Sequence, residues 1–179
     1  GFQIGPRLNA AGRLDDMALG IRCLVTDDID ESRELAAQLS ELNRERRSLQ
    51  ADMEREAGAI VDGLLASRAG ALPAALIVSD PSWHAGVVGL VASRLTERLH
   101  RPTLALAPAG PDATEWRGSG RSVAGFHLRD ALVELDRRCP GLLIRFGGHA
   151  MAAGLSIDVQ QVPALSAAFE AVADTLLDE

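Results

Sequence analysis

Apolar residues between Asp28 and Arg68 recur at alternating three- and four-residue steps or their multiples, which predicts one long amphipathic helix from Asp28 to about Arg68. The apolar positions are Leu35, Leu39, Leu42, Leu49, Met53, Ile60 and Leu64. Asp28, followed three residues later by Glu31, forms the start expected of a capping box. A helix of ~40 residues would be about 60 Å long. Because it has one apolar stripe, we interpret it as a linker between two lobes. The alternative, a self-associating coiled coil, is disfavoured by Arg46 in the stripe.

The hydrophobic pattern changes on both sides of this helix. Before it, the Gly-, Pro- and Asn-containing segment Gly5–Arg13 predicts a loop, and Met17–Val25 predicts a short apolar helix. After Ala71, short apolar runs alternate with amphipathic segments, which is typical of an α/β fold. Strands are predicted at Ala74–Ser79, Thr103–Ala107, Glu115–Val123 and Leu155–Val159, and helices at His84–His100, Leu128–Arg138 and Gln161–Leu177. The glycine-rich segment Phe146–Gly154 is predicted to be a loop.

The distribution of charge matters more than its total of −7. Residues 71–157 contain nine Arg and seven acidic residues, so this segment is positive, and the excess acid lies in the flanking segments. The chain contains no Lys. Arg is the side chain best suited to bidentate phosphate contacts, so the negative net charge does not exclude a polyanionic partner. Apolar runs stay shorter than the ~18–20 residues of a membrane span. The two distant cysteines, Cys23 and Cys139, favour reduced thiols in a cytoplasmic protein.

The strongest local motif is the run that begins with Gly147, Gly148 and His149. Paired glycines let backbone N–H groups approach an anion without interference from a Cβ atom. The small residues that follow would allow a helix to start there, and a helix N-terminus attracts phosphate. His149 would donate a hydrogen bond to a phosphate oxygen or hold a water molecule. The alternative is a sharp turn with a solvated histidine, which the small-residue run Ala152–Gly154 makes the weaker interpretation.

A second motif, Trp116–Ser122, presents Arg121 between glycines on an extended segment. Together with Ser119 and Ser122, Arg121 would form a compact phosphate clamp. The alternative is a surface arginine in a flexible turn.

Two further segments are open to both structural and functional interpretations. Trp83 and His84 follow a predicted strand and precede Gly86 and Gly89; domain packing and ligand binding are about equally favoured for them. The glycines imply close packing against another backbone or a ligand. Arg7, Asn9 and Arg13 would grip phosphates, or pair with carboxylates of another domain, and the structural role is slightly favoured.

No metal-ligand cluster, nucleophile elbow or phosphate-binding Walker loop is visible in the sequence. Aromatic residues make up only 3% of the chain, which argues against a wide base-stacking surface. The sequence thus offers binding groups without cleaving groups.

These segments, in this order, resemble the RecJ family of DHH/DHHA1 phosphoesterases. Gly5–Arg13 resembles the segment that ends the DHH domain, and the run from Leu42 to Arg47 resembles the interdomain linker. Ser82–Arg94, Arg121–Val123 and Gly147–Gly154 resemble the DHHA1 motifs. The resemblance implies an α/β fold with a DHHA1-type mixed sheet and flanking helices, preceded by a long interdomain helix. It also implies three parts: 1–27, the tail of a DHH domain; 28–70, the linker helix; and 71–179, the substrate-binding DHHA1 domain.

The resemblance further implies a function in DNA repair and recombination. The full-length protein would be a hydrolase that degrades single-stranded DNA from 5′ to 3′ with two divalent metals, Mn²⁺ or Mg²⁺. Those ions would be held upstream of Gly1, in a DHH domain that partners this chain together with an OB-like domain, so the chain itself would be inactive. Arg121, Ser119 and the segment from Gly147 to His149 would contact DNA phosphates, with His149 nearest the scissile one. The alternatives are a nano-RNA or cyclic-dinucleotide phosphodiesterase and a non-catalytic nucleic-acid-binding module.

Overall fold

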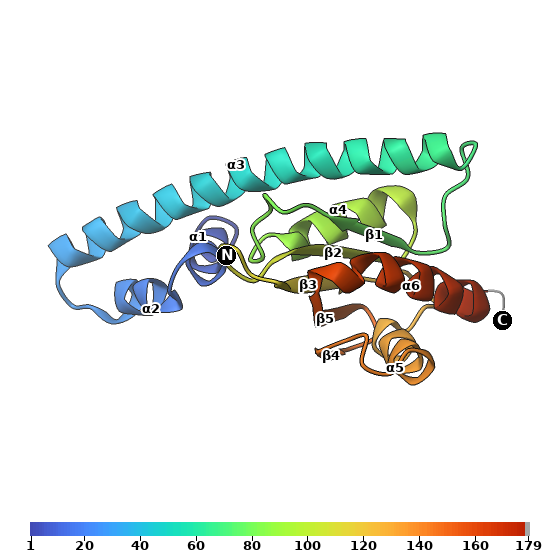
Figure 1. Cartoon of the computed structure of the whole chain (residues 1–179). Coiled ribbons are helices and arrows are strands. Elements are labelled where there is room, and N and C mark those ends of the chain that lie inside the picture. Colours follow the sequence, from blue (N-terminus) through green and yellow to red (C-terminus); the bar gives the residue numbers. More distant parts are fainter. Residues whose placement is uncertain (178–179) are drawn as a thin grey trace. The chain divides into compact units, whose positions relative to one another are not determined.

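A computed structural model describes residues 1–177 of the chain (Figure 1). The chain forms two compact units, Gly1–Asp52 and Met53–Glu179, and the boundary between them falls inside the long helix α3 (Ile29–Ser67). The predicted long helix is therefore confirmed. The functional division into 1–27, 28–70 and 71–179 stays a prediction.

The first unit begins with helices α1 (Ile4–Leu14) and α2 (Met17–Val25). The prediction of α2 is confirmed, but the prediction of a loop over Gly5–Arg13 is wrong. Pro6 lies in the first turn of α1, where a backbone N–H would lack an intrahelical partner in any case, so it does not interrupt the helix. Ala10 and Ala11 are fully buried, and their burial fixes the inner face of α1.

The start of α3 uses only half of the predicted capping box. The Asp28 Oδ1 atom accepts hydrogen bonds from the backbone N–H groups of Asp30 at 2.9 Å and Glu31 at 3.2 Å, as an N-cap should. The Glu31 carboxylate, however, bonds to Thr26 and Arg22, and these hydrogen bonds lower the pKa of Glu31. The backbone N–H of Asp28 instead donates to Thr26 Oγ1 at 3.3 Å.

The buried stripe of α3 follows the prediction at first and then departs from it. Leu35, Leu39 and Met53 are buried as expected, but near the end of the helix Val61 is buried at 1% exposure in place of Ile60. Ala57 is buried as well, at 0% exposure, so the buried face in the second half of the helix runs through Met53, Ala57 and Val61 at four-residue steps, which place residues on one face of a helix.

The second unit is built on a five-stranded mixed sheet of order β1-β2-β3-β5-β4. The strands are β1 (Leu76–Ser79), β2 (Thr103–Pro108), β3 (Glu115–Arg121), β4 (Arg145–Gly148) and β5 (Ala152–Asp158). Strands β1 and β2 are parallel, and the remaining neighbours are antiparallel. The predicted α/β class with a mixed sheet is confirmed.

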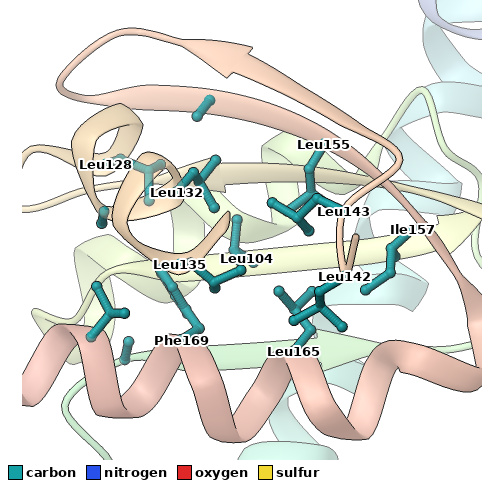
Figure 2. Close-up of a cluster of buried hydrophobic side chains, with 14 of the residues drawn as sticks. Leu104, Leu128, Leu132, Leu135, Leu142, Leu143, Leu155, Ile157, Leu165 and Phe169 are labelled. Carbon is teal, nitrogen blue, oxygen red and sulfur yellow. The ribbon is translucent and has the colours of Figure 1, made fainter. Parts of the chain in front are cut away.

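Helices cover the two faces of this sheet differently (Figure 1). Helices α5 (Leu128–Arg138) and α6 (Val162–Leu177, preceded by a 3₁₀ turn, Val159–Gln161) pack on one face. Figure 2 shows the core between them and the sheet. Its labelled side chains are Leu104, Leu128, Leu132, Leu135, Leu142, Leu143, Leu155, Ile157, Leu165 and Phe169. Helix α4 (Val88–Leu99) lies on the other face against β2 and β3.

Two local predictions in this unit are wrong. The segment Phe146–Gly154 is a hairpin made by β4 and β5, so the expected helix start after His149 is absent from it. Helix α4 begins at Val88 rather than at His84, and the residues between them form turns. The Asp80 Oδ1 atom accepts from the backbone N–H of Ser82 at 2.8 Å and stabilises the turn that follows β1.

Candidate nucleic-acid interface

The face of the sheet that carries α4 also presents a row of polar and glycine positions on β3, β5 and β4. We call this surface the open face and define it by Arg117, Ser119, Arg121, Gly154, Ser156, Arg145 and Gly147. Strand pairing sets two rows across it: Arg117, Ser156 and Arg145 form one, and Ser119, Gly154 and Gly147 form the next. A hollow of about 390 Å³ lies over these two rows, and Ala85 and Val88 complete its wall.

Arg121 and Ser119 are brought together on β3, as predicted. The Arg121 Nη1 atom donates to Ser119 Oγ at 3.2 Å and to the backbone carbonyl of Gly120 at 2.7 Å. Helix α4 lies directly against the pair: a methyl group placed on Gly89 would lie 2.9 Å from Ser119 Oγ and 3.2 Å from Arg121 Nη2. The close packing inferred for Gly89 is therefore present, and the guanidinium is held in one orientation before any ligand arrives.

Ser122 does not lie on the open face with its neighbours. Its side chain is 6% exposed, and its Oγ donates to the backbone carbonyl of Phe126 at 2.6 Å. Successive strand residues point to opposite faces, so the residue after Arg121 faces the core. The Ser122 hydroxyl stabilises the turn before α5, and we leave it out of the proposed contacts.

The Gly147–Gly148–His149 segment forms the end of β4 and the tip of the hairpin. A side chain on Gly147 would meet no atom within 4 Å, so this position opens onto the hollow. Gly148 has a φ of +150°, and a methyl group there would lie 2.4 Å from the Ala152 carbonyl oxygen, so only glycine fits. His149 is exposed, and its backbone N–H donates to the same carbonyl at 2.8 Å.

The hairpin tip is fixed by two hydrogen bonds from outside the hairpin. The Met151 carbonyl accepts from the Ser122 N–H at 3.1 Å, and the Ala150 carbonyl accepts from the Leu128 N–H at 2.9 Å. The exposed His149 side chain is thus carried on a tip that is bonded to Ser122, the residue after β3, and to the first residue of α5.

Trp83 and His84 separate into two different roles. Trp83 is 4% exposed, and its Nε1 donates to Glu56 Oε2 of α3 at 2.8 Å, which makes it a packing residue within the second unit. His84 is exposed, and its Nδ1 accepts from the backbone N–H of Gly86 at 3.1 Å. A ligand could therefore reach His84 but not the indole of Trp83.

Arg7, Asn9 and Arg13 lie on α1 in the first unit. Arg7 Nε donates to Ser40 Oγ of α3 at 3.0 Å, and its Nη1 bonds to the backbone carbonyl of Gln3. Asn9 is exposed and Arg13 is half-buried. Arg13 contributes to lowering the pKa of Arg46, after burial and the charge of Arg47. The bond to Ser40 holds Arg7 against α3, and the pairing of Arg7 and Arg13 with carboxylates of another domain stays a prediction.

The sequence motifs did not single out three residues of the open face: Arg117, Arg145 and Ser156. Arg145 Nε donates to Ser156 Oγ at 3.1 Å, and its Nη2 lies 3.1 Å from Glu115 Oε1. The Ser156 hydrogen bond, followed by the charge of Arg145, lowers the pKa of Glu115, so this carboxylate stays ionised. Arg117 lies two residues before Ser119, and the period-two rule for strands could have placed it on the same face.

Residues 1–177 contain no group of three His, Cys, Asp or Glu side chains that could hold a metal ion. Cys23 and Cys139 are free thiols. Among the same residues, no helix is both long enough and apolar enough to cross a membrane.

The comparisons with known proteins agree with this architecture. The DHHA1 domain model matches residues 72–175. The single-stranded-DNA-specific exonuclease RecJ of Escherichia coli (strain K12) is 53% identical over 158 residues, covering 88% of this chain and 27% of the relative. The Bacillus subtilis (strain 168) enzyme of the same name is 38% identical over 181 residues, covering all of this chain and 22% of the relative.

Among solved structures, RecJ from Thermus thermophilus in complex with Mn²⁺ superimposes with a TM-score of 0.79 at 37% identity, covering 97% of this chain and 24% of that one. A complex of RecJ from the same organism with Mg²⁺ gives a TM-score of 0.78. The chain thus spans about a quarter of the length of the curated relatives it matches. With the domain model and the sheet in agreement, the chain belongs to the DHHA1 domain family and is similar to RecJ exonucleases along nearly its whole length.

Proposed function

We propose that this chain is the part of a RecJ-type exonuclease that holds single-stranded DNA while the strand is degraded from 5′ to 3′ in repair and recombination. The observation that carries the proposal is the oriented Arg121–Ser119 pair beside the glycine floor of Gly147 and Gly154. The identity to RecJ relatives supports single-stranded DNA as the ligand. We also propose that the protein acts in the cytoplasm.

The chemistry of the open face suits a phosphate. An arginine guanidinium suits a phosphate because it presents several N–H donors in one plane, and Ser119 together with the Gly120 carbonyl holds that of Arg121 in place. A preoriented guanidinium loses little conformational freedom when it binds an anion, so more of the contact energy contributes to affinity. Gly147 and Gly154 expose backbone without a Cβ atom, so a sugar–phosphate strand can approach the sheet closely.

His149 has a supporting role in this proposal. Its exposed imidazole, on a tip fixed by Ser122 and Leu128, would donate a hydrogen bond to the phosphate nearest the cleavage point. Residues 1–177 contain no group of three His, Cys, Asp or Glu side chains that could hold a metal ion. We assign the two metal ions to a DHH domain of the same protein, on the similarity to RecJ structures with Mn²⁺ or Mg²⁺, and derive no step through them. The chain alone is expected to bind strands without cleaving them. Mn²⁺-dependent digestion of single-stranded DNA by the purified chain would refute the proposal that this chain binds DNA and another domain cleaves it.

The direct test of the binding role is Arg121→Ala. We expect weaker binding of single-stranded DNA and a salt dependence of the affinity whose slope is smaller by about one unit, because one phosphate contact is lost. The measurement is fluorescence anisotropy of a labelled oligonucleotide over a series of salt concentrations, starting at low salt because a single unit offers few contacts. Arg129→Ala, which removes the same charge from the exposed start of α5, is the control and should leave the slope unchanged. An unchanged slope in Arg121→Ala would exclude Arg121 as a phosphate contact.

A further inference from the structure

Besides the Arg121–Ser119 pair, the open face carries two further arginines, Arg117 on β3 and Arg145 on β4, with Ser156 of β5 between them. Neighbouring strands are about 4.8 Å apart, so the Cα atoms of the two arginines are roughly 10 Å apart across Ser156. Both side chains are exposed, while Ser156 is 3% exposed and forms the floor between them. Two guanidinium groups thus stand on either side of a small polar floor inside the hollow of about 390 Å³.

Arg117 and Arg145 give this row two positive charges. Two carboxylates lie beside the row on the same face: Glu115, held ionised by the Ser156 hydroxyl and Arg145, and Asp158, its partner across β3 and β5. The Asp158 Oδ1 atom accepts from the backbone N–H of Gln160 at 2.8 Å. Arg145 uses its Nε for Ser156 and its Nη2 for Glu115, and a guanidinium has five N–H groups in all. These two bonds hold Arg145 in place while leaving it donors for an anion. The surrounding Gly147 and Gly154 positions present no side chain that would block an approaching strand.

The distance between the Arg121–Ser119 pair and the row of Arg117, Ser156 and Arg145 determines which ligands can contact both. Arg117 lies four residues from Arg121 on the same face of β3, which is about 13 Å along an extended strand. The Ser119–Gly154–Gly147 row lies between them and forms the floor of the hollow. A ligand that reaches both Arg117 and Arg121 must therefore pass over the row of Ser119, Gly154 and Gly147.

We propose that Arg117 and Arg145 form a second phosphate-contact row, which binds only strands that continue across the glycine floor from the Arg121–Ser119 pair. This inference rests on the proposed function and deepens it: the first pair holds one phosphate of any ligand, and the second row adds affinity only for a longer strand. The open face thereby distinguishes an oligonucleotide from a dinucleotide without reading the bases.

The test is a nuclear magnetic resonance titration of the whole chain, which detects weak binding residue by residue. Two ligands are compared, a long oligothymidylate and a 5′-phosphorylated dithymidylate. The long strand should shift the Ser119 and Arg121 signals together with those of Ser156 and the Nε–H groups of Arg117 and Arg145. The dinucleotide should shift only the first pair. A long strand made of abasic nucleotides should shift both rows, because it carries the same phosphates.

Substitutions of the two arginines test the same inference quantitatively. Arg117→Ala and Arg145→Ala should each reduce the salt slope for the long strand by about one unit and leave dinucleotide affinity unchanged. Arg129→Ala again serves as the control for lost charge. If the long strand shifts Ser119 and Arg121 but not the Arg117 row, this inference fails while the proposed function stands. If it shifts neither, both fail. A second row that responds to the normal strand but not to the abasic one would contact bases, which would refute the phosphate assignment.

Discussion

Gly89 on helix α4 packs against Arg121 and Ser119 but is not itself a proposed contact to DNA. Replacing Gly89 can therefore change the affinity for DNA while the protein still folds. In Gly89→Ala the new methyl group would lie 2.9 Å from Ser119 Oγ and 3.2 Å from Arg121 Nη2. Both atoms are ends of side chains that can rotate, and no backbone atom is among these contacts. The helix can therefore stay in place while Ser119 and Arg121 move away from their present positions.

The two consequences have different sizes. Alanine is more favourable than glycine in a helix by up to about 1 kcal/mol. Forcing Ser119 off its preferred rotamer costs roughly 0.5–1.5 kcal/mol, so the free energy of unfolding should stay within about 1 kcal/mol of the wild type. Binding loses a charge-assisted contact, which contributes about 1.5–3 kcal/mol. At 1.4 kcal/mol for each factor of ten, the affinity for single-stranded DNA should fall roughly ten- to hundredfold.

Urea unfolding measures the stability of this variant, and oligonucleotide anisotropy measures its affinity. Gly63→Ala is the matched control, because a methyl group on this exposed residue of α3 would meet no atom within 4 Å. It should raise stability by up to about 1 kcal/mol and leave binding unchanged. If Gly89→Ala folds as the wild type does and also binds DNA as tightly, the orientation of Arg121 by its surroundings is not what confers affinity.

Two further predictions concern the scaffold. Gly148→Ala should destabilise the β4–β5 hairpin by about 2 kcal/mol or more, because the φ of +150° is strained for alanine and the new methyl group would lie 2.4 Å from the Ala152 carbonyl oxygen. Chemical denaturation measures this loss of stability, and a variant as stable as the wild type would refute the need for glycine at this position. Hydrogen bonds from Arg137 and then Arg138 lower the pKa of Glu134 from its ordinary 4.5 to about 2, so the stabilisation by this carboxylate is complete above pH 4.5 and is lost as the pH falls through about 2. The stability difference between the wild type and Glu134→Gln should therefore shrink over that pH window in acid denaturation curves, and a difference independent of pH would contradict the assignment.

The sequence predicted those elements whose periodicity is strong. Helix α3 and helix α5 were placed almost to the residue, because apolar positions repeat clearly and both ends carry capping or breaking residues. The glycine-rich strand β4 was missed, because glycine is rare in strands and common in loops. What overrides that preference is pairing with β5, a contact between distant residues that local propensity does not contain.

Of the candidate site, too, one part could be predicted from the sequence and the other could not. Arg121 and Ser119 were predicted because they are close in sequence and flanked by glycines. Arg145 joins Arg117 only through the order β3-β5-β4, in which Ser156 stands between them. That order depends on tertiary packing against α5 and α6, so a single sequence offered no signal that the two arginines share a face.

The glycines of this sheet have two distinct physical roles. A methyl group on Gly120 would lie 2.6 Å from Leu104 and 2.8 Å from Leu128, and one on Gly118 would press on Leu155, so these two glycines make room for the core beneath α5. On the opposite face a methyl group on Gly147 would meet nothing within 4 Å, and one on Gly154 only the Gly118 carbonyl at 3.7 Å. Core packing therefore does not require glycine at these two positions. A side chain there would instead occupy the hollow between Arg121 and Arg145, and a strand could no longer lie against the sheet and reach both.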